Sequence, residues 1–239
     1  MARADLSDAL RGGLLGVAVG EALGLPWVGV KPRAIKRDRL LDAVGPTGAV
    51  TAAVLAASAG GQTPLRVVEG SAGVLDDVGG QSPNSVGGVL GDSPRLAVAL
   101  TVGWRAYEDA GARRAAALPL GFGAVVVADL AALLLAGKAV HPLVTDHADD
   151  WPPPFHGVAA DERAILDALL AVLQRHDDPS EAMRAAARLG GGGTAVLVAL
   201  VGGLLGCRRP TAIDRVPWRE RVALPDEPTL AAAVAGLTA

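Results

Sequence analysis

The N-terminal segment combines helical periodicity with closely spaced glycines, and this combination restricts how the chain can pack. Its apolar side chains recur at three- and four-residue spacing, at Leu6, Leu10, Leu14 and Val17. This spacing predicts a helix that buries one face. The same segment carries four glycines, partly on one side: Gly12, Gly13, Gly16 and Gly20. Because glycine costs about 1 kcal/mol in a helix relative to alanine, they predict that another element approaches this helix closely.

The rest of the chain is also helical in its periodicity, with weak signs of strands. Further helices are expected at about 51–59, 95–109, 125–138, 160–175, 180–189 and from Ala195 onward. Two stretches interrupt the pattern. Residues 69–92, rich in Gly, Asp and Ser, predict a long loop, and residues 141–156, which contain three consecutive prolines, predict a surface crossing. We therefore expect an all-α fold, a compact helical bundle that forms a single domain over residues 1–239.

The composition fits this expectation and limits the partners of the chain. With 239 residues, 51% of them hydrophobic and 20% charged, the chain can bury a substantial core. Aromatic residues make up 3%, so that core must consist mainly of Ala, Val and Leu. The net charge of −3 gives no basic field for nucleic acid. The longest apolar stretches, 194–207 and 121–136, are shorter than the roughly 20 residues that span a bilayer.

The single cysteine, Cys207, excludes an intrachain disulfide and gives no sign of an oxidising compartment. The first residues include two acidic groups and lack the apolar centre of a secretory signal. We expect a cytoplasmic protein without nucleic-acid or membrane partners. The abundance of Ala and Gly, with Arg favoured over Lys, is typical of a GC-rich bacterial genome.

Four segments, in order along the chain, resemble motifs of the ADP-ribosylglycohydrolase family. Residues 11–26 are similar to the family's G-x-x-x-G-x-A-x-G-D-A-L-G-x-P, and residues 45–55 line up with G-x-W-T-D-D-T-A-x-x-L. Residues 115–121 are similar to A-M-R-A-A-P-L-G, and residues 180–222 look like a G-G-D-T-D-T block followed by I-P-x-x-W. The resemblance implies an all-α fold whose cleft, in the family, holds two magnesium ions and hydrolyses ADP-ribosyl bonds.

The chain departs from the family at the positions that bind those metal ions. The T-D-D and D-T-D-T motifs supply oxygen ligands to magnesium in the family. Apolar or small residues stand at the matching positions: Gly48, Ala49 and Val50, then Gly193, Thr194, Ala195 and Val196. No Asp or Glu lies between residues 43 and 64 or between 182 and 212, so a shift of register restores no ligand. We expect no bound metal, no cofactor and no magnesium-dependent hydrolysis; if the chain is an enzyme, its chemistry is metal-independent.

Two other family positions are altered. Glu21 keeps the charge of the acidic residue in G-D-A-L-G, whereas Val28 replaces a glutamate that usually follows the next proline. The arginine of the third motif falls on Ala116, although Arg113 and Arg114 lie just upstream. Glu21, beside the expected cleft, is a candidate general acid or base; the alternative is a solvated or ion-paired carboxylate.

The substitutions share one chemical direction, from acidic to apolar. They predict a pocket that suits a small apolar molecule better than a diphosphate, because burying unpaired phosphate charge there would be costly. The predicted lining residues are Trp27, Val28, Ala49, Val50, Gly193, Ala195 and Val196. One hypothesis is a metal-independent small-molecule protein, for example a biosynthetic enzyme. The alternatives are a non-catalytic binding or structural pseudoenzyme, and ADP-ribose binding without hydrolysis.

Overall fold

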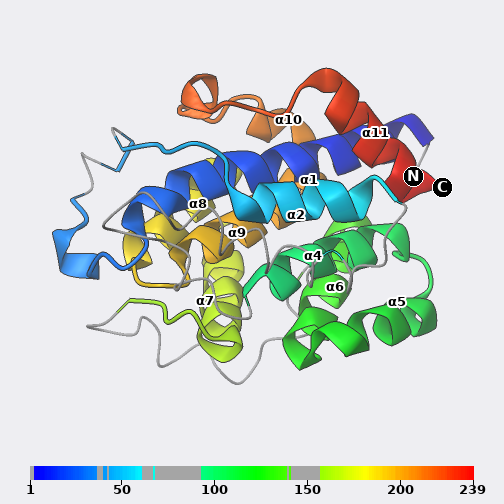
Figure 1. Cartoon of the computed structure of the whole chain (residues 1–239), viewed down its shortest axis with the longest axis horizontal. Coiled ribbons are helices and arrows are strands. Elements are labelled where there is room, and N and C mark those ends of the chain that lie inside the picture. Colours follow the sequence, from blue (N-terminus) through cyan, green and yellow to red (C-terminus); the bar gives the residue numbers. More distant parts are fainter. Residues whose placement is uncertain are drawn as a thin grey trace.

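A computed structural model describes residues 3–36, 40–41, 43–60, 67, 93–138, 140 and 157–239. Over these residues the chain is a bundle of α-helices, and the predicted all-α class is confirmed (Figure 1). Within the same ranges, β pairing is limited to an isolated parallel bridge between Val28 and Gly191. The loop predicted at 69–92 and the proline segment at 141–156 lie outside the described residues.

Two antiparallel helices, α1 (Arg3–Gly24) and α9 (Thr194–Arg208), form the centre of the bundle (Figure 1). Their backbones meet at successive turns, where a Cβ on an α1 glycine would strike an α9 carbonyl group: Gly12 on Gly206, Gly16 on Gly202 and Gly20 on Val198. The residue numbers of the α9 partners decrease as those of the α1 glycines increase, so the two helices are antiparallel. The close approach predicted from the glycines of this helix is therefore confirmed.

Every residue of α9 from Thr194 to Cys207 is buried. A helix that is apolar all round must be surrounded by other elements. Its neighbours besides α1 are α4 (Ser93–Arg105), α6 (Phe122–Leu135), α7 (Glu162–Arg175) and α8 (Pro179–Leu189). The prediction of a buried helix from Ala195 onward is confirmed.

The remaining helices cover this centre. Helix α2 (Ala49–Ser58) packs on α1 and α4, and α5 (Ala110–Ala117) packs on α6. The short α10 (Pro210–Ile213) and the last helix, α11 (Glu227–Thr238), pack against α1. Within the described ranges, short 3-10 turns connect the helices: η1 (Leu25–Trp27), η2 (Pro32–Ala34), η4 (Leu118–Leu120) and η6 (Arg219–Arg221).

The predicted helices are found with shifted ends. Helix α4 spans Ser93–Arg105 where 95–109 was expected, and α6 begins three residues before the predicted start. Helices α5, α10 and α11 were not predicted. Aspartates cap α5, α7, α8 and α11, each accepting a hydrogen bond from the backbone N–H three residues on: Asp109, Asp161, Asp178 and Asp226.

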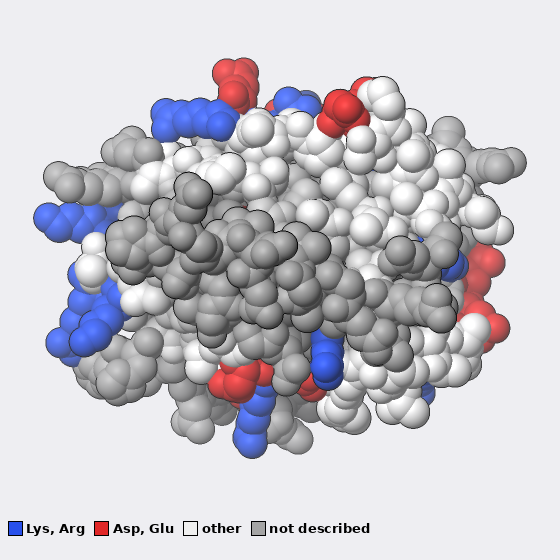
Figure 2. All heavy atoms as spheres, in the orientation of Figure 1, with Lys and Arg blue, Asp and Glu red and all other residues white. Residues whose placement is uncertain are grey.

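Charged side chains of both signs lie around the edge of the face shown in Figure 2, and the described atoms at its upper right are mostly uncharged. Among the helices that the structure describes, none combines the length and hydrophobicity needed to cross a bilayer.

Candidate functional site

The C-terminal end of α1 brings together the segments that match the family's metal-binding motifs. Gly24, the last residue of α1, lies against the start of α9: a Cβ there would be 2.9 Å from the Cα of Ala195 and 3.0 Å from the carbonyl oxygen of Thr194. One turn earlier, Glu21 reaches the start of α2 through Gly48 and its neighbours. The N-termini of α2 and α9 therefore converge on the same end of α1.

Glu21 is bound to the N-terminus of α2 by both carboxylate oxygens. Oε1 accepts a hydrogen bond from the N–H of Val50 at 2.9 Å. Oε2 accepts from the N–H of Gly48 at 2.9 Å, the N–H of Thr51 at 2.8 Å and the hydroxyl of Thr51 at 2.6 Å. The Glu21 side chain is buried, with the residue 1% exposed. A carboxylate is stabilised here because the first N–H groups of a helix lack intrahelical partners and form its positive pole.

The sequence explains why this cap comes from another helix. The residue at the N-cap of α2 is Gly48, which has no side chain to accept a hydrogen bond. Glu21 supplies the missing acceptor from α1. The Glu21 carboxylate is therefore not exposed to solvent, and among the described residues it forms no ion pair. These contacts give Glu21 a structural role, and none of them supports the predicted role in acid or base catalysis.

The glycine-rich loop before α9 is held on both sides by backbone hydrogen bonds. On one side, the N–H of Gly191 donates to the carbonyl of Val30 at 3.0 Å, and on the other the N–H of Gly193 donates to Val158 at 3.0 Å. Gly190 and Gly191 have φ angles of 60° and 93°, which favour glycine. The glycines and the bound N–H groups of the loop thus hold it to the neighbouring segments. Their presence is explained without a phosphate ligand.

The predicted lining residues fall into two groups. Val50, Ala195 and Val196 are core residues with at most 1% of their surface exposed, and Gly193 is buried with them. Trp27, Val28 and Ala49 are half-buried. The structure therefore places all seven around the end of α1, with the second group nearer the surface. A ligand-binding role for them stays a prediction.

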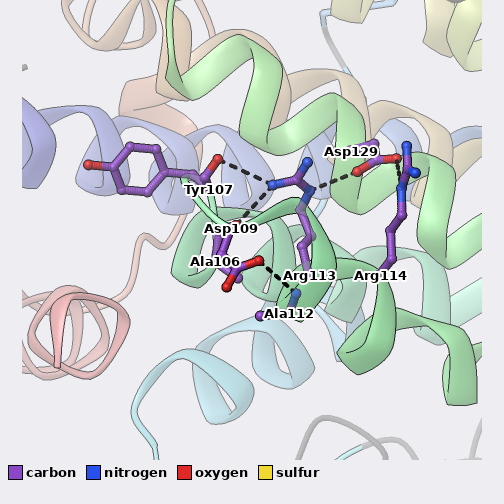
Figure 3. Close-up of polar contacts among 7 residues, drawn as sticks. All are labelled: Ala106, Tyr107, Asp109, Ala112, Arg113, Arg114 and Asp129. Atoms are coloured by element: carbon purple, nitrogen blue, oxygen red, sulfur yellow. Dashed lines mark hydrogen bonds and ion pairs between the residues drawn. The ribbon is translucent and has the colours of Figure 1, made fainter.

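The two arginines just upstream of the third family-like segment lie in a separate cluster. Arg113 of α5 donates to Asp129 of α6 at 2.7 Å and to the carbonyls of Ala106 and Tyr107 at 2.9 and 3.2 Å (Figure 3). Arg114 binds the other oxygen of Asp129 at 3.1 Å. This cluster joins α5 to the end of α4 and to α6. Sequence reasoning missed it, although Asp129 is the one charge in the apolar stretch 121–136.

Acidic, histidine and cysteine side chains do not gather into a metal site in the part of the chain that the structure describes: no three of them are grouped so that they could hold an ion. Cys207 is buried, and burial raises the pKa of its thiol to about 12, so it is protonated at neutral pH.

Comparison with known proteins supports the fold. No protein-family model and no curated protein matches the sequence. One similar solved structure is described as an "ADP-ribosylglycohydrolase-related protein complex"; its TM-score is 0.61 at 21% sequence identity, and the match covers 98% of each chain. A likeness at this identity establishes the fold alone. The chain described here therefore has an ADP-ribosylglycohydrolase-like fold along nearly its whole length.

Proposed function

We propose that this protein uses the ADP-ribosylglycohydrolase-like fold without magnesium and does not hydrolyse ADP-ribosyl bonds. The observation that carries the proposal is the engagement of Glu21. Its two oxygens take four hydrogen bonds from the first turn of α2 and the residue before it. The acidic residue that the first motif retains is therefore committed to capping a helix.

The surroundings of Glu21 also disfavour a divalent cation. Magnesium keeps near-octahedral oxygen coordination and binds proteins through one or more carboxylates. The matching positions at the starts of α2 and α9 carry Ala49, Val50, Gly193 and Ala195, which offer none. Each helix N-terminus adds about half a positive charge. A cation at this end of α1 would thus meet two positive helix poles, only partly offset by the negative C-terminal pole of α1, and one carboxylate whose oxygens already have donors.

We propose that an apolar small molecule binds at the same end of α1, against Trp27, Val28 and Ala49. These side chains are apolar and half-buried. A diphosphate gains little there, because Glu21 already supplies the negative charge that the N-terminus of α2 favours. At α9, the N–H groups of Gly193 and Thr194 are bound to backbone carbonyls of Val158 and Gly191.

Calorimetry with ADP-ribose, with and without magnesium, tests the first part of the proposal. We expect no change in affinity when magnesium is added and no release of ADP-ribose from an ADP-ribosylated peptide. An active ADP-ribosylglycohydrolase assayed in parallel provides the positive control. Magnesium-dependent affinity or turnover would contradict the proposal.

A thermal-shift screen with uncharged apolar compounds tests the second part. For a compound that raises Tm, the near-isosteric Val28→Thr change should reduce the shift, because it places a hydroxyl against the ligand. Val234→Thr, at a half-buried valine of α11, is the matched control and should leave the shift unchanged. If no compound raises Tm and the protein instead forms a stable complex with another protein, the non-catalytic binding alternative replaces the proposal.

A further inference from the structure

A groove of about 820 Å³ runs between α6 and α7, with Arg114 and Asp129 at its rim, and it shares no lining residue with the predicted pocket at the end of α1. Its floor is apolar and comes from both helices: Phe122, Val125, Val126, Leu166 and Leu170. The α6 members lie at positions i, i+3 and i+4 and the α7 members at i and i+4, so each set follows one face of its helix. Phe122 is 77% exposed, which is high for a large apolar side chain. The volume is in the range of small-molecule sites.

The carboxylates on the rim of the groove already have partners. Asp129 is shared by Arg113 and Arg114 (Figure 3). Glu162, at the start of α7, accepts a hydrogen bond from the N–H of Gly123 in the first turn of α6. Asp167 lies 3.8 Å from Arg163, one turn away on the same helix. Each rim carboxylate therefore already has a donor, and with Arg113 counted the three carboxylates are matched by three arginines.

Arg114 provides unfilled hydrogen-bond donors at the same rim. With Arg113 it gives the Asp129 cluster two positive charges for one negative charge. Only Nε of Arg114 is bound to Asp129, and among the described residues its two terminal amino groups have no hydrogen-bond partner. The side chain is 66% exposed. A guanidinium with free amino groups suits a planar carboxylate, which it binds through two parallel N–H donors.

We propose that this groove binds a small amphipathic carboxylate, with the apolar body of the ligand on the floor and its carboxylate on Arg114. The free N–H donors of Arg114, beside carboxylates that already have partners, favour an anion over a cation. The apolar floor favours a hydrocarbon or aromatic body over a sugar or nucleotide. The proposal shares no residue with the pocket proposed at the end of α1, so either can fail without the other.

Two probes with the same chain and opposite charge test the proposal: decanoate and decyltrimethylammonium, each titrated calorimetrically below its micelle concentration. We expect decanoate to bind at least about tenfold more tightly, which is the effect of one charge-assisted hydrogen bond. Equal affinity for the two probes, or failure of decanoate to bind, would overturn the proposal.

Three variants assign the contacts. Arg114→Gln should weaken decanoate by about tenfold and leave the cation unaffected, because it removes the charge. Val126→Thr should weaken both probes, and Arg215→Gln, at an exposed arginine outside the groove, should change neither. Unchanged Tm values show that the variants fold. The proposal would be overturned if Arg114→Gln left the affinity for decanoate unchanged. It would also be overturned if the protein formed a concentration-dependent dimer that Val126→Thr dissociates and decanoate does not, because a second copy of the chain would then occupy the groove.

Discussion

Oε2 of Glu21 lies 2.6 Å from the hydroxyl oxygen of Thr51, across the contact between the end of α1 and the start of α2. The same oxygen accepts the backbone N–H of Thr51 at 2.8 Å. One buried carboxylate thus ties the end of α1 to the start of α2. The contacts of Glu21 are those of a helix cap.

Replacing Glu21 should therefore destabilise the protein. Glu21→Ala leaves the N–H groups of Gly48, Val50 and Thr51 buried without this acceptor, and we expect a loss of about 2–4 kcal/mol in the free energy of unfolding. Glu21→Gln should lose less, because the amide keeps one oxygen acceptor. Urea denaturation measures both values.

Thr51→Val is the control for Glu21. It removes the hydroxyl and keeps the backbone N–H, so only one of the four hydrogen bonds to Glu21 is lost. We expect a loss of about 1 kcal/mol. A Glu21→Ala protein as stable as the wild type would show that the carboxylate does not cap α2.

The contact between α1 and α9 should be equally sensitive to added volume. A Cβ on Gly16 would strike the backbone carbonyl of Gly202, which cannot move without shifting α9. We expect Gly16→Ala to lower the free energy of unfolding by about 1–3 kcal/mol despite the higher helix propensity of alanine. Guanidinium denaturation checks this value.

Gly111 is the matched control, an exposed glycine in helix α5. A Cβ there has one neighbour, the Oδ1 of Asp109 at 3.4 Å, which is ordinary van der Waals contact. Gly111→Ala should therefore leave stability unchanged or raise it by up to about 1 kcal/mol. Equal effects at Gly16 and Gly111 would show that close backbone packing does not explain the glycines of α1.

The sequence predicted those features that depend on local patterns. Helix α8 (Pro179–Leu189) lies within one residue of its expected range, because Pro179 marks its start and Gly190 marks its end. The glycine spacing of α1 predicted close packing without naming the partner. By contrast, α11 (Glu227–Thr238) was missed because its Ala-rich sequence has weak amphipathic contrast, although Asp226 gives a capping signal.

The sequence predicted where the candidate site lies but not which groups form hydrogen bonds there. Motif resemblance predicted that Glu21 and the start of α2 lie together, and the structure places them in hydrogen-bond contact. It could not show that Glu21 caps α2, because the donors lie 27 to 30 residues further along the chain and meet it only after folding. The pairing of Arg113 with Asp129 escaped prediction for the same reason, because it depends on the packing of α5 on α6.

Arg113 and Arg114 bind the same carboxylate but should differ widely in their effect on stability. The Arg113 side chain is 10% exposed and also donates to two backbone carbonyls, so Arg113→Ala breaks a buried network and should cost about 3–5 kcal/mol. The Arg114 side chain is 66% exposed, so Arg114→Ala should cost less than about 1 kcal/mol. Thermal unfolding of the two variants checks the contrast; similar losses would contradict the assignment of Arg113 as the structural partner of Asp129.

Cys207 should make stability fall in alkaline solution. Burial raises its thiol pKa to about 12, whereas an unfolded thiol has a pKa of about 8.5. Between these values the unfolded chain releases a proton that the folded chain keeps, so the free energy of unfolding decreases as pH rises, by at most about 1.4 kcal/mol per pH unit for this group. Cys207→Ala lacks this contribution. Urea denaturation from pH 7 to 10 gives the free energy of unfolding of both proteins, and the difference between the two pH profiles cancels the effect of the other titrating groups. The wild type should lose stability relative to the variant above about pH 8.5, and parallel profiles would mean that the thiol ionises as readily in the folded protein as in the unfolded one.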